Sequence, residues 1–243
     1  MNAIDIKWLR KVYGDIEAVA GLDLTIEEGE LFALLGVNGA GKSTTIKMLS
    51  CLTKPTAGDA YVLGNSITQN SAPVKEVLGV SPQETAVAPN LTVKENLEFM
   101  AGVYGLNREE TKLRPREMMD ALGLGAVAGR KAKTLSGGWQ RRLSIALALI
   151  SKPKILFLDE PTLGLDVLAR RELWGVIESL KGRVTVILTT HYMEEAEELA
   201  DRIAIMAAGR LQAVGTVAEL LERTGSKNLE EAFVSLAKGG GTR

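Results

Sequence analysis

A glycine-rich loop at residues 36–43 carries the residue types best suited to binding phosphate groups. It reads Gly-Val-Asn-Gly-Ala-Gly-Lys-Ser, follows an apolar run at residues 31–35 and opens a segment of helical character that reaches residue 49. Glycines allow backbone N–H groups to surround phosphates, the lysine neutralises their charge, and the helix N-terminus adds its positive end. The sequence therefore predicts a nucleotide phosphate site, with the serine also placed to ligate Mg²⁺. Its predicted residues are Gly36, Asn38, Gly39, Ala40, Gly41, Lys42, Ser43 and Thr44.

Two adjacent carboxylates end a second apolar run. Asp159 and Glu160 directly follow the sequence Ile-Leu-Phe-Leu at residues 155–158. Carboxylates at the end of a buried strand are costly unless they meet a cation or a hydrogen-bond donor. We expect Asp159 to hold Mg²⁺ through water and Glu160 to act as the general base toward an attacking water. The alternative for this pair is an acidic N-cap at a strand–helix junction.

Three further side chains are candidates for the same site. His191, the single histidine, follows an apolar run at residues 184–188 and two threonines, where it could reach a terminal phosphate; a merely packed or exposed histidine is the alternative. Gln83 lies where the chain would leave the core, and its amide could contact both water and Mg²⁺, unless it is a solvated turn residue. Tyr13 follows the first predicted strand and could stack on a base, with an ordinary surface tyrosine equally compatible.

The apolar runs also predict the fold that positions these residues. Runs at residues 31–35, 155–158 and 184–188 are nearly continuous, which is typical of parallel strands buried on both faces. Each is followed by a polar or glycine-rich turn and then a helix, so we expect a doubly wound α/β sheet with its chemistry at the carboxyl ends of the strands. Two half-buried antiparallel strands are predicted before it, because apolar residues alternate with polar ones at Ile4, Ile6, Trp8, Leu22, Leu24 and Ile26.

The middle of the chain has helical periodicity instead. One predicted helical face contains Val93, Leu97, Met100, Ala101 and Tyr104, and a second contains Leu143, Ala146, Leu147 and Ile150. We therefore predict a single domain over residues 1–243. It consists of a core at about 1–83 and 154–223, an inserted helical subdomain at about 84–153, and a tail at 224–243. The tail should hold a helix near 229–237 and a disordered end at Gly239, Gly240 and Gly241.

Composition limits the classes of partner. The chain has 29 Lys and Arg residues against 30 Asp and Glu residues, so its net charge of −1 gives no global attraction to nucleic acid or anionic lipid. Nine basic against four acidic residues at 108–142 indicate either solvated helix faces or a basic surface that meets a partner or lipid headgroups. The lone Cys51 excludes an internal disulfide and suits a reducing, cytoplasmic compartment. The longest apolar run, residues 145–150, is far shorter than the roughly 20 residues of a bilayer-spanning helix.

Together these motifs resemble the nucleotide-binding subunit of an ATP-binding-cassette (ABC) transporter. The resemblance covers residues 4–223 and includes Leu-Ser-Gly-Gly at residues 135–138, here called the signature segment. It implies ATP hydrolysis with Mg²⁺ on a P-loop NTPase core that has an N-terminal antiparallel β-subdomain and an inserted α-helical subdomain. It also implies a head-to-tail homodimer or heterodimer, in which the signature segment of one subunit caps the ATP held by the other. The residues implied at the dimer seam are Ser136, Gly137, Gly138 and Asp166, while Tyr13 matches the adenine-stacking position and His191 the γ-phosphate switch.

Trp139 and Leu163 depart from the commonest pattern of this family, in which glutamine and a small polar residue stand at these positions. A tryptophan at position 139 resembles the drug, antibiotic and polysaccharide exporters whose permease is a separate chain. The resemblance thus implies a membrane permease partner, a peripheral position on the cytoplasmic face of the cell membrane, and no nucleic-acid partner. The alternative is a soluble ABC ATPase that acts in cofactor assembly, on ribosomes or on DNA. We expect residues 84–96 to dock the permease, with Leu91, Val93 and Leu97 as apolar anchors. Internal packing is the alternative for Val93 and Leu97.

Overall fold

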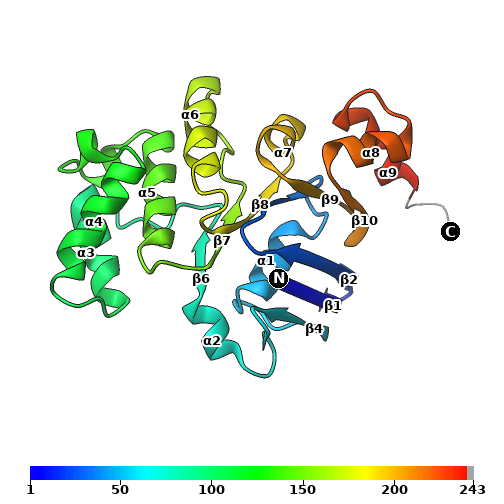
Figure 1. Ribbon diagram of the computed structural model, residues 1–243, viewed down its shortest axis with the longest axis horizontal. Helices are drawn as coiled ribbons and strands as arrows, with labels where there is room; N and C mark the ends of the chain where they lie inside the picture. The colour runs from blue at the N-terminus through cyan, green and yellow to red at the C-terminus, as the bar shows by residue number, and fades with distance from the viewer. Residues whose placement is uncertain (240–243) are drawn as a thin grey trace.

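A six-stranded sheet forms the centre of the computed structural model, which describes residues 1–239 (Figure 1). The strand order is β10-β9-β3-β8-β7-β6, and β10 alone is antiparallel to its neighbour. The strands are β3 (Leu31–Leu35), β6 (Leu78–Ser81), β7 (Ile155–Asp159), β8 (Thr185–Thr190), β9 (Arg202–Ala207) and β10 (Arg210–Gly215). The carboxyl ends of five parallel strands therefore lie along one edge, as the apolar runs predicted.

Both faces of this sheet are buried, which is why its strands read as continuous apolar runs. In β3, Leu31, Ala33 and Leu35 pack into one hydrophobic cluster, together with residues of α5 (Gly137–Leu149), α6 (Val167–Glu178) and α7 (Met193–Leu199). Phe32 and Leu34 face the opposite cluster, which contains α1 (Lys42–Leu49) and the second sheet. The predicted doubly wound core is confirmed.

The second sheet is antiparallel and has the order β2-β1-β4-β5. Its strands are β1 (Asn2–Tyr13), β2 (Ile16–Glu27), β4 (Ala57–Val62) and β5 (Asn65–Ser66). Ile4 and Ile6 are buried as predicted, but the prediction for Trp8 is wrong, because its side chain is 58% exposed. The pairing register shifts between Ile6 and Leu9, Trp8 has a φ of 48°, and Leu9 occupies the buried face instead. A bulge of this kind turns one side chain away from the alternating pattern.

Helices α3 (Val93–Val103), α4 (Glu110–Ala121) and α5 gather at one end of the molecule (Figure 1). Two short 3-10 turns, η1 (Gly125–Val127) and η2 (Ala132–Thr134), connect α4 to α5. Helix α3 starts with a capping box in which Thr92 and Glu95 bond each other's backbone N–H groups. The predicted faces are buried except at two positions. Met100 is only partly buried, and Tyr104 is 45% exposed, since it forms the C-cap of α3 where the helical periodicity ends.

The opposite end of the molecule is formed by α8 (Val217–Thr224) and α9 (Leu229–Gly239), while α2 (Ser71–Glu76) lies below the sheets in the view of Figure 1. Leu229 and Phe233 of α9 are buried, and the Leu229 backbone N–H donates to Glu197 of α7 at 3.2 Å. Helix α9 includes Gly239, so the prediction of disorder there is wrong. Gly240 and Gly241 lie outside the described residues.

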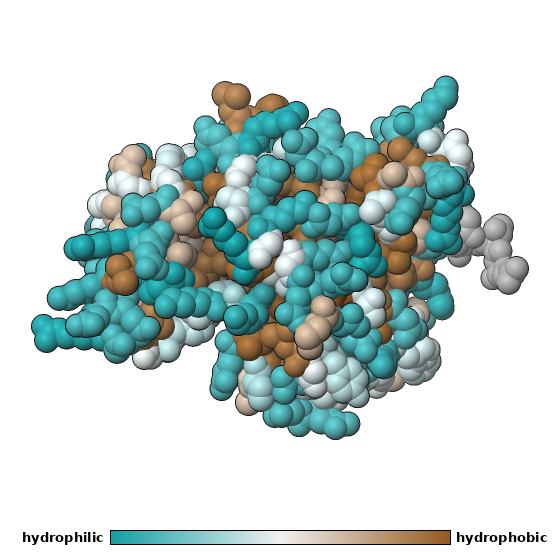
Figure 2. Space-filling model, viewed as in Figure 1, coloured by the Kyte–Doolittle hydropathy of each residue, from teal (hydrophilic) through white to brown (hydrophobic). Residues whose placement is uncertain are grey.

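The surface in view is largely hydrophilic, with a few apolar side chains over the helical end (Figure 2). Over the part of the chain that the structure describes, every helix is too short or too polar to cross a membrane.

Candidate nucleotide site

The phosphate loop, residues 36–44, connects β3 to α1 and needs glycine for steric reasons. Gly39 and Gly41 have φ values of 82° and 100°, which side chains rarely allow. A Cβ atom on Gly41 would come within 2.5 Å of the Ala18 carbonyl oxygen, and one on Gly36 within 2.5 Å of the Met206 carbonyl oxygen. Glycine at positions 36 and 41 therefore lets the loop pack directly against the backbone at Met206 and Ala18.

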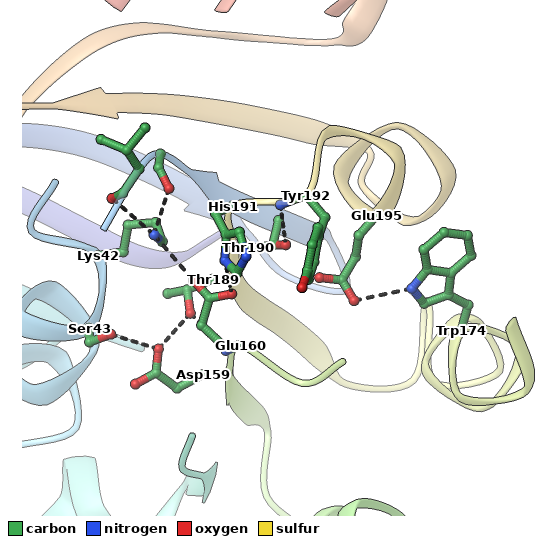
Figure 3. Close-up of polar contacts among 12 residues, drawn as sticks. Lys42, Ser43, Asp159, Glu160, Trp174, Thr189, Thr190, His191, Tyr192 and Glu195 are labelled. Carbon is green, nitrogen blue, oxygen red and sulfur yellow. Dashed lines mark hydrogen bonds and ion pairs between the residues drawn. The ribbon is translucent and has the colours of Figure 1, made fainter. Parts of the chain in front are cut away.

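Lys42 lies at the start of α1 with its side chain 5% exposed. Its ammonium donates to the Gly36 carbonyl oxygen at 2.7 Å and to the Val37 carbonyl oxygen at 3.3 Å. It also forms an ion pair of 3.2 Å with Glu160 Oε1. A buried ammonium is stable only with such partners, and this group links the phosphate loop to the residue that follows β7 (Figure 3).

Asp159 and Glu160 lie next to the phosphate loop, as predicted. Asp159 Oδ1 accepts hydrogen bonds from Ser43 Oγ at 2.9 Å and from Thr189 Oγ1 at 2.6 Å. Thr189 Oγ1 also accepts from the Glu160 backbone N–H at 3.0 Å. Thr189 was not predicted as a site residue; the only signal was its place among the polar residues that end the third apolar run. Asp166 is the N-cap of the following helix, so the N-cap alternative for Asp159 and Glu160 is excluded.

Glu160 is held in an unusual backbone conformation, with a φ of 48°. This left-handed geometry costs a non-glycine residue about 1–2 kcal/mol. Its carboxylate lies between two basic groups, with Oε1 facing Lys42 and Oε2 at 2.8 Å from His191 Nδ1. Figure 3 shows the three side chains converging from α1, from the end of β7 and from the end of β8. The strained turn therefore directs a carboxylate toward the phosphate loop.

A cavity of about 500 Å³ lies in front of these groups. Gln83, Glu160 and His191 line it together with residues 38–44, so the structure brings most of the predicted site into one cavity. Tyr13 is absent from this lining; its ring is 46% exposed and lies 4.8 Å from the Lys11 ammonium. The lining residues that the sequence did not predict are Ile16, Glu17, Ala18 and Leu163.

The signature segment lies outside this cavity. Ser136 is exposed at the N-cap of α5, and no backbone group of the described residues bonds its side chain as a cap. A Cβ atom on Gly138 would come within 3.3 Å of Ala169, and one on Gly137 within 3.4 Å of Leu165, so the glycines allow α5 to start close to α6. Asp166 caps α6 by accepting from the Ala169 backbone N–H at 2.9 Å. The structure groups these residues together, away from the phosphate loop of the same chain.

A buried polar pair lies behind His191. Trp174 of α6 donates from Nε1 to Glu195 Oε1 of α7 at 3.1 Å, and Glu195 is fully buried. Burial raises the pKa of the Glu195 carboxyl, and the nearby carboxylate of Glu160 adds to the increase. Arg170 of α6 stacks on the Tyr192 ring at 4.7 Å. These contacts fix α7, and with it His191, against α6.

Comparison with known proteins identifies the relatives of this site. A family model described as ABC transporter matches residues 19–163. The daunorubicin/doxorubicin resistance ATP-binding protein DrrA of Streptomyces peucetius is 43% identical over 94% of this chain and 69% of its own length. The phospholipid-transporting ATPase ABCA3 of Homo sapiens is 43% identical over 92% of this chain, which spans only 13% of ABCA3.

Solved structures agree with the sequence relatives. An ATP-binding subunit of an ABC transporter has a TM-score of 0.84 and 28% identity, and the match covers 96% of this chain and 99% of that chain. A dimeric ATP-binding cassette in a post-hydrolysis state, bound to ADP and phosphate, has a TM-score of 0.78 and 29% identity, with 88% and 98% covered.

The fold and the site define a P-loop nucleotide hydrolase with a helical subdomain inserted into its core. With the family match over more than half of its length, the chain belongs to the ABC transporter family. It is an ATP-binding and ATP-hydrolysing subunit of that family, as the resemblance implied.

Proposed function

We propose that this subunit uses ATP hydrolysis to drive export through a separate membrane permease, at which it sits peripherally on the cytoplasmic face. ATP hydrolysis is supported above all by the position of the Glu160 carboxylate, which lies between Lys42 and His191 in the wall of the phosphate-loop cavity. Export is supported by the drug-resistance relative DrrA, of which this chain spans 69%. A separate permease is supported by Trp139, since a tryptophan at this position resembles the exporters whose permease is a separate chain.

In the proposed reaction, Lys42 is the first group that the terminal phosphates of ATP engage. A phosphate carries more negative charge than a carboxylate, so it competes with Glu160 for the Lys42 ammonium. Glu160 remains oriented by His191 and by its left-handed backbone. Its freed oxygen then accepts a proton from the water that attacks the γ-phosphorus, while the bond to the β-phosphate breaks and ADP leaves. His191, whose Nδ1 lies 2.8 Å from Glu160 Oε2 in the same cavity wall, contacts the γ-phosphate beside Glu160.

The donor set next to the loop fits Mg²⁺. Ser43 Oγ and Asp159 Oδ1 lie 2.9 Å apart and are oxygen ligands of the kind that Mg²⁺ prefers. The described residues contain no group of three or more His, Cys, Asp and Glu side chains that could hold a metal alone. This fits an ion shared with nucleotide phosphates and water, held by Ser43 and Gln83 and, through water, by Asp159. When bound, Mg²⁺ would neutralise charge on the phosphates.

The signature segment is proposed to act on the ATP of a second subunit. Ser136 and Gly137 are exposed and lie outside the cavity of their own chain, which supports this assignment. The related cassette whose solved structure is dimeric supports it further. Ser136, Gly137 and Gly138 would cap the partner's nucleotide, Asp166 would lie at the seam, and Tyr13 would stack on the adenine of its own ATP.

The helical subdomain, residues 84–153, is proposed to contact the permease, while the core at 1–83 and 154–223 binds nucleotide. Val93 and Leu97 are fully buried, so their prediction as docking anchors is wrong and their internal packing alternative holds. The exposed apolar side chains of α3 are instead Phe99 and Val103, at 58% and 62%. They support a docking surface about one to two helical turns beyond the expected segment.

Purification of the tagged chain from detergent-solubilised membranes of its host tests the partner. We expect a multi-span membrane protein to co-purify, and we expect Phe99→Ser or Lys94→Glu to weaken that association without changing ATP hydrolysis by the isolated subunit. Leu52→Ser is the matched control, because Leu52 is 69% exposed but lies after α1 in the core. If the chain is recovered with ribosomes or cofactor-assembly proteins instead, the permease proposal is wrong.

A further inference from the structure

Arg141 is a buried charged residue of α5 that the reaction above does not use. Its side chain lies one turn after the signature segment and the residue is 5% exposed. The guanidinium donates to the carbonyl oxygens of Pro82 and Gln83, each at 2.7 Å. These consecutive carbonyls follow β6 at the point where the chain enters the helical subdomain. Burial lowers the pKa of Arg141, while the carboxylates of Asp159 and Glu195 act in the opposite direction.

A second contact lies on the same face of α5. Ser144 is three residues after Arg141, and its Oγ is 2.8 Å from Ser81 Oγ, with both residues almost fully buried. Three successive residues, 81–83, are therefore bonded by two side chains of one helix. The planar fork of arginine suits two adjacent carbonyls, which a lysine could not hold in the same fixed geometry.

The contact of Arg141 with residues 82 and 83 joins two different parts of the surface. Gln83 lines the nucleotide cavity of its own chain, whereas α5 presents Ser136 and Gly137 on the exposed surface. A second hollow, lined by Gln83, Arg141 and Gly137 among others, runs between them. Any displacement of the Gln83 backbone must therefore strain two charge-assisted hydrogen bonds or move the start of α5 with it.

We propose that Arg141 is a positioning residue that transmits movement of Gln83 to the signature segment. ATP bound in one cavity thereby adjusts the segment that serves the other ATP. The role of the signature segment in this proposal rests on the proposed function. The link between Gln83 and α5 within one chain does not, so the two can fail separately.

Hydrogen–deuterium exchange tests the link in a Ser136→Arg background, where dimer closure should be blocked and only effects within one chain remain. We expect ATP to change deuterium uptake both at residues 36–44 and at residues 136–149. Adding Arg141→Met should keep the change at 36–44 and abolish the change at 136–149. A purely structural role would alter uptake at 136–149 equally with and without ATP. Persistence of the ATP-dependent change at 136–149 in Arg141→Met would overturn the proposal.

Kinetics in the otherwise unaltered chain give the second readout. Arg141→Met should lower kcat on the order of tenfold, because two charge-assisted hydrogen bonds are lost, with a nearly unchanged affinity for a fluorescent ATP analogue. Arg141→Lys should recover part of kcat, and Arg116→Met, at an exposed arginine of α4, should have no effect. If Arg141→Met does not fold, Ser144→Ala removes the neighbouring contact and should lower kcat to a smaller extent. An unchanged kcat in both Arg141→Lys and Ser144→Ala would then contradict the proposal. Normal hydrolysis by Ser136→Arg would instead refute the cross-subunit assignment alone.

Discussion

Glu160 combines three constraints that a catalytic base requires. Its left-handed backbone points the carboxylate into the cavity, its backbone N–H is bonded to Thr189, and its two oxygens face Lys42 and His191. Both carboxylate oxygens are thereby held in place in the wall of the phosphate-loop cavity. A carboxylate with this orientation needs little reorganisation when ATP takes over Lys42.

Glu160→Gln should keep ATP binding and lower turnover at least about 100-fold, because the amide retains the size of the carboxylate and one accepting oxygen but cannot accept the proton. Phosphate release measures turnover, and size-exclusion chromatography with Mg²⁺-free ATP should show a persistent dimer. Glu194→Gln, at an exposed carboxylate of α7, is the control and should hydrolyse ATP normally. Near-normal turnover in Glu160→Gln would remove Glu160 from the base role.

The elements that carry these residues could be predicted to different degrees. Strands β3, β7 and β8 were evident because burial on both faces leaves a continuous apolar run, and their polar ends marked the phosphate loop, Glu160 and His191. Trp8 was misplaced because a register shift leaves no trace in an alternating pattern. The hydrogen bonds of Arg141 to Pro82 and Gln83 could not be predicted from the sequence either. Arg141 is separated from these residues by 59 and 58 positions in the chain, and only the packing of α5 on β6 brings them together.

Helix α7 contributes both to the stability of the fold and to the position of His191. It begins two residues after His191, and it is fixed to α6 by the buried bond between Glu195 and Trp174. A buried carboxyl with a raised pKa is more easily ionised in the unfolded chain than in the folded one. Its contribution to stability is therefore fully present below the unfolded pKa of about 4.5 and is lost as the pH rises through the higher folded pKa.

Glu195→Gln should accordingly change the pH dependence of stability. Glutamine does not ionise, and its amide oxygen can still accept a hydrogen bond from Trp174. The melting temperature of the variant should therefore rise relative to that of the unaltered chain as the pH increases from 4 toward 8. This pH range begins below the ordinary pKa of about 4.5 and ends above it. Thermal unfolding followed by circular dichroism at several pH values measures this difference. Glu194→Gln should show a difference that is small and independent of pH. A constant difference for Glu195→Gln would show that its ionisation is not linked to folding.

At the scale of the whole molecule, the surface around the signature segment carries exposed apolar side chains. Val167 and Leu168, in the first turn of α6, are 68% and 78% exposed, and Figure 2 shows apolar atoms protruding over that helix. Val37 of the phosphate loop is likewise 55% exposed. Exposed apolar residues beside both the loop and the signature segment favour a head-to-tail contact that would cover them together. Such a contact places the loop of one chain against the signature segment of the other.

Mixing two inactive variants tests this arrangement. Lys42→Ala should inactivate a homodimer by removing the charge that faces the phosphates, and Ser136→Arg should do so by blocking closure on the partner's ATP. If each site uses Lys42 of one chain and Ser136 of the other, a mixed dimer carries both changes in one site and keeps the second site intact. Equimolar mixing should then restore ATP hydrolysis to roughly a quarter of the wild-type rate, since half of the dimers are mixed and each has one working site.

The control for this mixing experiment is a chain that carries both changes. Combined with Lys42→Ala, the double variant has no intact pair of Lys42 and Ser136 in any dimer, so its mixture should stay inactive. Thermal unfolding of each variant should accompany the assay, because Lys42→Ala leaves the buried Glu160 carboxylate without its ion-pair partner, and such a loss costs about 3–5 kcal/mol of stability. If Ser136 served the ATP of its own chain, each single variant would be inactive in every pairing. No recovery on mixing two folded single variants would therefore contradict the cross-subunit site.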